Sequence, residues 1–273
     1  MGLHVDPAAI CLLIAVAFAA GWLDAVVGGG GLVQVPALML ALPSVPVATV
    51  LGTNKLVAIT GTSGAAVTYV TRVGLDRRRA LVAAALGLPT ALVGAVTASH
   101  LPRDVIVLVV AATLVAVGVW AVVARPGDRA HPDPRPDPRP QPCAGTAVPA
   151  WRPTLVLAVG ASTVGFYSGV VGSGTGVLLV ALFVTALGTD FLRGSAMAKV
   201  VSIGSDLGAL ALFGLLGHVL WLLGAGMAVA NVAGGIVGAR TALARGAGFV
   251  RAVLLIVVVG LVVKIVHDQW LAR

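Results

Sequence analysis

The chain has 273 residues, of which 59% are hydrophobic and only 10% are charged. A soluble domain is about a quarter charged, so this chain has too little polar surface to cover a water-soluble globule. Its mean hydropathy is +1.04, and apolar runs near 20 residues recur, a length that crosses a hydrocarbon core of ~30 Å as helix. The composition predicts an all-α integral membrane protein and excludes a transmembrane barrel, which needs alternating apolar and polar residues.

The net charge of +8 does not indicate a nucleic-acid partner, because most arginines lie in short loops between apolar runs, where they set membrane topology. The two cysteines, Cys11 and Cys143, suggest neither a disulfide framework nor a metal site. Glu is absent, and no zinc-binding, phosphate-loop or nucleophile-elbow motif occurs. We therefore expect no enzyme activity, no metal and no cofactor.

The first half, residues 1–124, is predicted to be a transmembrane repeat of five helical pieces. Its apolar segments, in chain order, are residues 8–27, 32–51, 55–73, 80–99 and 104–124. Gly28–Gly31 separate the first two segments, and Pro36, Pro43 and Pro46 lie within the second. Glycines and prolines at membrane depth break helices and free backbone groups, which protein or water must then satisfy.

Residues 125–152 are the only hydrophilic stretch of any length. Within it, His131–Pro142 alternates proline with polar residues, a pattern that favours polyproline II and cannot bury a core. We interpret the stretch as a linker, with a docking site for a proline-binding domain as the alternative. The second half, residues 153–273, is predicted to be a second transmembrane repeat with apolar segments at 153–171, 177–188, 195–216, 219–239 and 249–267.

The two halves match without a gap when one is shifted by 144 residues. The shift places Gly28 on Gly172, in the run Gly172–Gly176, and it places Lys55 on Lys199. It also places Gly94-Ala95 on Gly238-Ala239. We interpret this match as the duplication of a half-protein.

Loop charges favour inverted over parallel halves. The loop at 72–79 has four arginines and is expected in the cytoplasm, whereas its counterpart at 216–223 has no Lys or Arg. Conversely, the weakly charged loop at 99–104 corresponds to 240–251, which has three arginines that a parallel arrangement would place outside. Inversion predicts a cytoplasmic linker and both termini outside. It gives 8–10 transmembrane segments, because each glycine-broken stretch either crosses as two short pieces or forms a hairpin that enters and leaves on one side.

Lys55 and Lys199 are two of only three lysines in the chain. A charge at bilayer depth costs roughly 2.5–3.5 kcal/mol on insertion scales, and such residues usually face a cavity or a partner. Both lysines are expected at the start of a helix, where the positive end of the helix dipole disfavours an uncompensated cation. A bound anion would relieve both problems. The alternative is a lysine that snorkels to the membrane interface.

The glycine runs are the second candidate for anion binding. Glycines that open a helix expose backbone N–H groups and permit close approach of an anion, although tight turns or close helix packing would also explain them. Hydroxyls at Ser173 and Thr175 add donors to the second run. The candidate substrate-binding residues are Gly28, Gly29, Gly30, Gly31, Asn54, Lys55, Ser173, Gly174, Thr175, Gly176 and Lys199.

Asp24 and Asp206 are carboxylates inside apolar sequence and are candidates for coupling transport to protons or sodium. Alternatively they are structural partners of the lysines or caps of broken helices. The 144-residue shift places Asp24 on Ser168 and Thr62 on Asp206, so neither carboxylate is repeated in the other half.

Two sets of residues resemble the signatures of the TauE/SafE sulfite exporter family. The first set is Gly21–Gly31, Pro36 and Gly52-Thr53-Asn54-Lys55; the second is Gly165–Gly169, Gly174-Thr175-Gly176, Asp190-Phe191, Ala196 and Lys199. Family members often have Asp where Ser168 stands and Asn where Ser202 or Ile203 stands. The resemblance implies a secondary transporter, usually an exporter, of small sulfur-containing anions such as sulfite or sulfonates, with about eight transmembrane segments.

Together, the residues and the resemblance predict a multi-pass transporter of the cell membrane that works by alternating access. Two broken helices and two lysines would form its site for a small anion, as inverted-repeat transporters commonly build such sites. An anion channel with the same positive site, or a non-transporting membrane scaffold, is the alternative. The sequence leaves open the exact substrate, the coupling ion and whether the protein is a homodimer.

Overall fold

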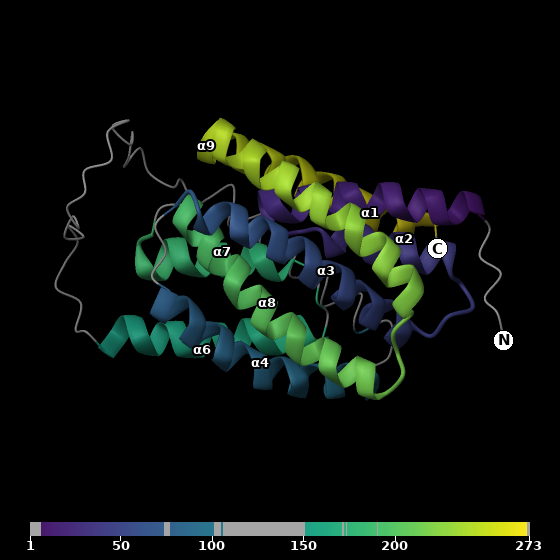
Figure 1. Ribbon diagram of the computed structural model, residues 1–273, viewed down its shortest axis with the longest axis horizontal. Helices are drawn as coiled ribbons and strands as arrows, with labels where there is room; N and C mark the ends of the chain where they lie inside the picture. Colours follow the sequence, from purple (N-terminus) through teal and green to yellow (C-terminus); the bar gives the residue numbers. More distant parts are fainter. Residues whose placement is uncertain are drawn as a thin grey trace.

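The structure, a computed structural model, describes residues 7–73, 77–100, 105, 151–170, 172, 174–189 and 191–271. Within these ranges every regular element is a helix (Figure 1). The linker residues 125–150 lie outside the described part of the chain, as does the helix predicted over 104–124 apart from residue 105.

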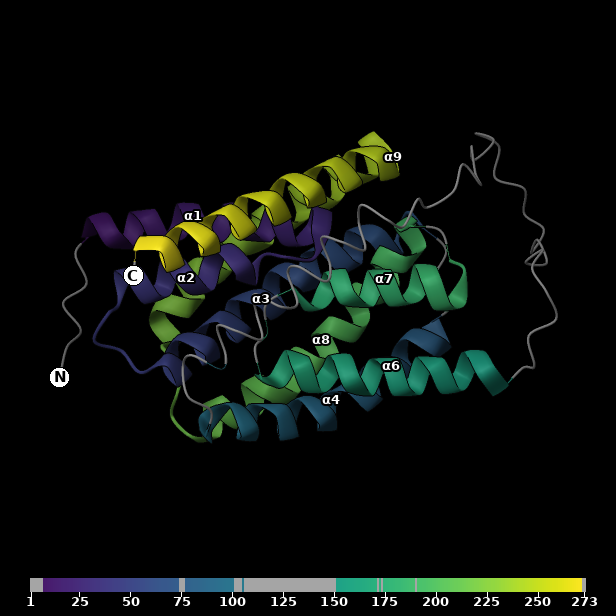
Figure 2. The ribbon, with the colours of Figure 1, turned by 180° about the vertical axis from the view of Figure 1, so that it is seen from behind.

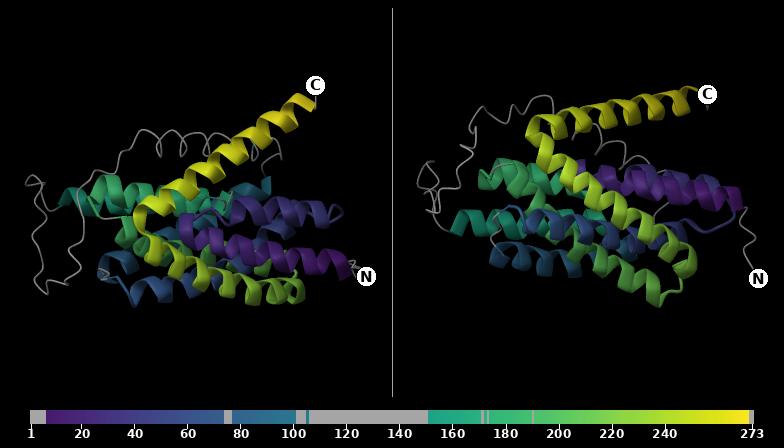
Figure 3. Two further views of the ribbon diagram at one scale, coloured as in Figure 1. Left: turned by 90° about the horizontal axis from the view of Figure 1, so that it is seen from above. Right: turned by 45° about the horizontal axis from the view of Figure 1, so that its top comes forward.

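In the described residues, each half has a long helix, then a short helix, then two long helices. The first half contains α1 (Pro7–Val27), α2 (Gly31–Ala41), α3 (Val47–Val70) and α4 (Arg77–His100). The second half contains α6 (Trp151–Val170), α7 (Thr175–Leu187), α8 (Phe191–Leu215) and α9 (Trp221–Leu271). Helix α9 bends at Gly246, where φ is 73°, and its two parts diverge in direction (Figure 3).

Four of the described helices are long and apolar enough to cross a membrane. They are Pro7–Val27, Ala80–Ala98, Leu192–Leu215 and Trp221–Gly246. The outer surface is apolar as well: Leu40, Leu215 and Leu222 are 78–92% exposed. Lipid rather than water accommodates such a surface, because water penalises large exposed apolar patches. For the described part of the chain, these features confirm the predicted helical, multi-pass membrane protein.

The chain reverses direction at each glycine run. A Cβ added at Gly30 would lie 2.4 Å from the carbonyl oxygen of Ala20, so the start of α2 lies against α1. Farther along, the Asn231 amide donates to both the Ala17 carbonyl and the Gln34 side chain, which shows that α2 runs back beside α1. These two helices form a helical hairpin, the α1–α2 hairpin.

Helices α6 and α7 form the equivalent α6–α7 hairpin. A Cβ at Gly160 would lie 2.4 Å from the Leu182 side chain, so α7 folds back along α6. Helix α1 begins at the end of the molecule where the N-terminus lies, whereas α6 begins at the opposite end (Figures 1 and 2). The two hairpins therefore approach each other from opposite ends.

The two halves are interlocked. Helix α1 packs along α9 and α6 along α4, while α3 packs on α8 and α9, and α8 on α4. The 144-residue shift exchanges the members of these pairs, because it carries α1 onto α6, α3 onto α8, and α4 onto the first part of α9. The closest approaches match too: a Cβ at Gly94 would lie 2.1 Å from the Phe166 carbonyl oxygen, and one at Gly238 2.4 Å from that of Trp22. Small residues permit this close helix packing.

The helix boundaries correct one sequence prediction. Helix α3 begins at Val47, directly after Pro46, whose fixed φ suits the residue that precedes a helix. Lys55 therefore lies two turns inside α3, and Lys199 lies equally far inside α8, which begins at Phe191. The expectation that both lysines start a helix is wrong. The break expected between 239 and 249 is also shorter than predicted, since α9 continues to its bend at Gly246.

Replacing Gly28 by Ala is expected to destabilise the fold. Its φ of 85° costs a non-glycine residue ~1–2 kcal/mol, and the new Cβ would lie 2.6 Å from the Gly176 backbone. Gly226→Ala is the matched control, because a Cβ there meets nothing within 4 Å and alanine favours a helix by ~0.5–1 kcal/mol. Scanning fluorimetry of the detergent-purified protein should show a lower unfolding midpoint for Gly28→Ala only. Equal midpoints for the two variants would contradict the tight hairpin contact.

Candidate functional site

Lys55 is held by two side chains of the other half. Its Nζ lies 2.5 Å from Asp206 Oδ1 on α8 and donates to Ser168 Oγ on α6 at 3.0 Å. The Ser168 hydroxyl donates in turn to the same Asp206 oxygen at 3.1 Å. We call these three residues the Lys55 triad.

Lys199, in the second half, makes the corresponding contacts with residues of the first half. Its Nζ lies 2.7 Å from Asp24 Oδ2 on α1 and also donates to the Asp24 backbone carbonyl. The Thr62 hydroxyl on α3 donates to the same carboxylate oxygen at 3.0 Å. We call these three residues the Lys199 triad.

The two triads are equivalent under the 144-residue shift, with one exchange. Each contains one lysine, one carboxylate and one hydroxyl. In the Lys199 triad the carboxylate, Asp24, is on the first helix of a half, whereas in the Lys55 triad that position is Ser168 and the carboxylate is Asp206 on the third helix. The asymmetries Asp24/Ser168 and Thr62/Asp206 thus compensate each other, and each lysine keeps one carboxylate.

Burial makes both ion pairs costly to break. The lysine side chains are each 3% exposed, and the carboxylates of Asp206 and Asp24 are 10% and 23% exposed. Removing one partner of a buried pair typically costs 3–5 kcal/mol, because the other charge is left without compensation. In this conformation both lysine side chains are enclosed by protein, and the charges of the four ionisable groups balance.

A small cavity of about 30 Å³ lies where the tips of the two hairpins meet. The tips touch: a Cβ at Gly28 would lie 2.6 Å from the Gly176 backbone. The walls come from the hairpin tips and from α1, α2, α3, α8 and α9. The lining residues are Ala20, Asp24, Gly28, Gly30, Gly31, Gln34, Asn54, Ala58, Thr62, Gly172, Gly174, Thr175, Gly176, Ser202, Asp206 and Asn231.

The cavity is built from equivalent positions of both halves. Five pairs of its lining residues are related by the 144-residue shift: Gly28 and Gly172, Gly30 and Gly174, Gly31 and Thr175, Ala58 and Ser202, and Thr62 and Asp206. The cavity therefore lies where matching positions of the two halves come together.

Polar atoms without partners face this cavity. Four of the five buried side-chain N and O atoms that lack a hydrogen-bond partner in the described residues belong to lining residues: Gln34 Nε2, Asn54 Oδ1, Thr175 Oγ1 and Ser202 Oγ. Buried polar groups in folded proteins are nearly always paired, so this concentration indicates a place for a polar ligand or water.

Two helix N-termini also converge on the cavity. Helices α2 and α7 begin at Gly31 and Thr175, and their N-cap residues, Gly30 and Gly174, make no side-chain cap hydrogen bond. The N–H groups of Leu32 and Val177 already donate to the carbonyls of Gly29 and Gly174, so the N–H groups that precede them in each helix are the ones left for a ligand, at the positive end of the helix dipole. Such N-termini bind anions.

The structure brings most of the predicted site residues together. Those that line the cavity are Asp24, Gly28, Gly30, Gly31, Asn54, Gly174, Thr175, Gly176 and Asp206. Gly29, Lys55 and Lys199 do not line it, although Lys55 Nζ would lie 2.8 Å from a Cβ at Gly172. Ser173 lies outside the described residues. In that part of the chain, no group of three or more His, Cys, Asp or Glu residues could hold a metal.

The predicted site residues leave out four polar lining residues: Gln34, Thr62, Ser202 and Asn231. The available signal was their position inside apolar sequence. Gln34 is a lone polar side chain in helix α2, and Asn231 is one of only two asparagines in the chain. Neither position belongs to a symmetric pair, so a search for repeated features passes over both.

Comparison with known proteins supports one assignment along the whole chain. The family model described as "Sulfite exporter TauE/SafE" matches residues 13–265. The chain is 32% identical over 260 residues to "Probable membrane transporter protein ORF9" of a Sinorhizobium species, covering 95% of this chain and 93% of that protein. It is 29% identical over 266 residues to "Probable membrane transporter protein YfcA" of Escherichia coli K12, covering 97% and 92%. No solved structure matches.

The exchanged carboxylates allow a direct test of the triads. Asp24→Ser should destabilise the protein by ~3–5 kcal/mol, because Lys199 loses its carboxylate, and Thr62→Asp should also destabilise it by crowding two carboxylates. The double variant copies the arrangement of the Lys55 triad and should recover most of the loss. Unfolding midpoints of the four proteins measure the coupling energy. Simple additivity of the two single changes would contradict the equivalence of the triads.

Proposed function

The chain belongs to the TauE/SafE sulfite exporter family, and on that basis we propose that it is a secondary transporter that exports a small sulfur-containing oxyanion, such as sulfite or an organosulfonate. The observation that carries the proposal is the central cavity, where two uncapped helix N-termini and four unpartnered polar atoms meet. Sulfite and sulfonate groups each present three oxygens, which suit several donors arranged around one point. The Gln34 amide and the Thr175 and Ser202 hydroxyls would supply those donors.

The small cavity volume favours alternating access over an open channel. A water needs ~10–15 Å³ of such volume, so about 30 Å³ holds two to three waters and is too small for a sulfonate. A substrate would enter only after the hairpin tips separate. We propose that the α1–α2 and α6–α7 hairpins move apart toward one side of the membrane and then toward the other. The tips, which meet from opposite ends, would gate the two sides in turn.

The opposite directions of α1 and α6 support inverted halves (Figure 1). Two halves that share one plan but run in opposite directions are related by an axis in the membrane plane. With the arginines of the 72–79 and 240–251 loops on the cytoplasmic side, this arrangement places the linker inside and both termini outside. We propose that the hairpins enter and leave the membrane on one side each.

The charge balance of the triads supports coupling to protons. The two lysines and two carboxylates together carry no net charge. A bound monovalent anion therefore gives the buried site a net negative charge, and a divalent anion gives it a larger one. A proton on Asp24 or Asp206 would restore neutrality and release an ammonium group toward the anion. The anion and the proton would then cross together, so the outward substrate gradient would drive export and an inward proton gradient would oppose it. Sodium is less suited to these carboxylates, because a lysine Nζ already lies within 2.7 Å of each.

Flux measurements test the proposed function. Reconstituted in liposomes, the protein should transport sulfite or a short sulfonate, and Lys55→Ala and Lys199→Ala should abolish net flux by unbalancing the site. Gln34→Leu copies the apolar residue at the matched position, Leu178, and should raise the KM about tenfold, as the loss of one hydrogen bond to an anion predicts. Thr185→Ala, on an exposed face of α7, is the control. Full transport by both lysine variants would contradict a role of the two triads in transport.

The channel and scaffold alternatives give different results in the same liposomes. A channel would show no acceleration of efflux by external substrate, whereas a transporter exchanges substrate across the membrane. A scaffold would be stabilised against heat by none of the small anions.

Ion gradients test the coupling. A proton gradient should drive substrate uphill in the direction of proton flow, and an equal sodium gradient should not. The driven flux should be insensitive to a clamped membrane potential if one proton accompanies each monovalent anion. Uphill transport driven by sodium alone would overturn the proton proposal and leave the anion site intact.

A further inference from the structure

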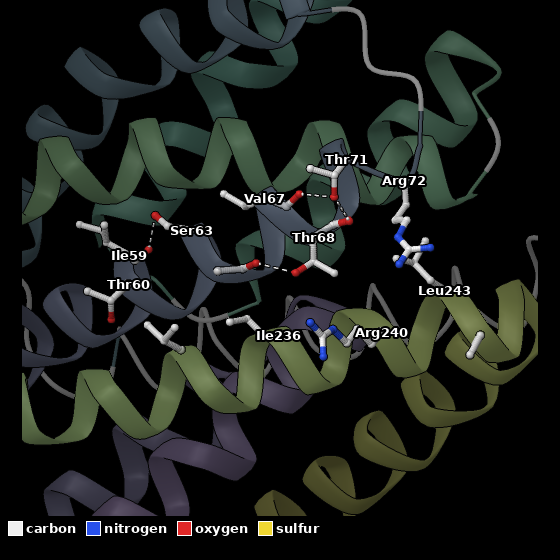
Figure 4. A pocket seen from close by; sticks show the side chains of 13 residues that line it. Ile59, Thr60, Ser63, Val67, Thr68, Thr71, Arg72, Ile236, Arg240 and Leu243 are labelled. Carbon is white, nitrogen blue, oxygen red and sulfur yellow. Dashed lines mark hydrogen bonds between the residues drawn. The ribbon is translucent and has the colours of Figure 1, made fainter.

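A second, larger hollow lies between α3 and α9 and is separate from the central cavity (Figure 4). Its volume is about 1080 Å³. Apolar side chains such as Val67 and Ile236 line most of it, and two arginines, Arg72 and Arg240, lie at one end. We call this hollow the α3–α9 groove.

The hydroxyl groups in the groove are already satisfied. Thr60, Ser63 and Thr68 each donate to a backbone carbonyl one turn back in α3, at 2.7–2.9 Å. Thr71 does the same at the end of the helix (Figure 4). Because these hydroxyls are turned onto their own helix, the groove offers methyl and aliphatic surface along its length. The guanidinium groups at its end are the charged donors that a ligand would meet.

The groove has the length of one membrane leaflet. From Ile59 to Arg72 the chain rises ~20 Å at 1.5 Å per residue, compared with ~15 Å for half of a hydrocarbon core. Its inner end is formed by Ile59 and Thr60. Their near neighbours in the sequence, Ala58 and Thr62, line the central cavity. Its outer end, at Arg72, follows the last turn of α3. The apolar length thus runs from the middle of the bundle to the helix end that carries the positive charges.

The equivalent face of the other half lacks these charges. The 144-residue shift replaces Arg72 by Leu216 and Arg240 by Val96, and it replaces Ser63 by Leu207. All three replacements are exposed apolar residues, as on an ordinary lipid-facing surface. The basic end is therefore a feature of one leaflet and not a consequence of the repeated fold.

We propose that the α3–α9 groove binds an anionic phospholipid of the leaflet at the Arg72 end. An acyl chain lies along the apolar wall, and the lipid phosphate accepts hydrogen bonds from Arg72 and Arg240. Basic pockets between transmembrane helices bind anionic headgroups in this way. The inference stands independently of the transported substrate, since the groove and the central cavity share no lining residue.

Native mass spectrometry of the purified full chain, titrated with phosphatidylglycerol or phosphatidylcholine, tests the site. We expect tighter binding of phosphatidylglycerol, weakened about fivefold by Arg72→Gln and by Arg240→Gln, as the ~1 kcal/mol per basic residue near an anionic surface predicts. Arg78→Gln, an exposed arginine at the start of α4 outside the groove, should leave binding unchanged.

A second variant tests the apolar part without changing charge. Ser63→Leu, which copies Leu207 of the other half, should fill the groove and reduce binding of both lipids. Inorganic phosphate in millimolar excess should not compete, because it has no acyl chain. Equal phosphatidylglycerol binding by wild type and the double arginine variant, or no preference over phosphatidylcholine, would overturn the proposal.

Discussion

Two buried ion pairs, each joining one half of the chain to the other, are the interaction on which the rest of the structure depends. A lysine inside a membrane protein needs a compensating charge, and here Lys55 takes it from Asp206 while Lys199 takes it from Asp24. Each pair links a long helix of one half to a helix of the other. In both pairs the carboxylate comes from the half that does not contain the lysine, just as α1 packs with α9 and α6 with α4 across the two halves.

The ion pairs also connect the site to its motion. The carboxylates of both pairs line the central cavity, whereas the lysines lie behind them. Asp24 belongs to one hairpin, and Ser168, which contacts Lys55, belongs to the other. Any separation of the hairpin tips must therefore rearrange contacts of the triads. In the proposed mechanism, an arriving anion or proton changes the same interactions that hold the tips together.

Sequence reasoning located the features that are local or repeated. Polypeptide composition identified the membrane class, and the glycine runs lie where α1 gives way to α2 and α6 to α7. It failed where an outcome depends on neighbours in space. Lys55 was expected to start a helix, but Pro46 begins α3 two turns earlier. Gln34 and Asn231 were overlooked because each is a single polar residue within an apolar run, and only packing shows that they face one cavity.

By itself the sequence determined the helical membrane class, the 144-residue match between its halves and the residues able to carry charge, because hydropathy, backbone freedom and residue type are properties of short stretches. The tertiary structure alone decided which charges pair. Along the chain, the matched positions Asp24 and Ser168 differ, and so do Thr62 and Asp206. In space, each lysine nevertheless has one carboxylate and one hydroxyl beside it. The physical reason is that a buried charge is balanced by whatever lies within a few ångströms, and that neighbour is set by packing between the halves.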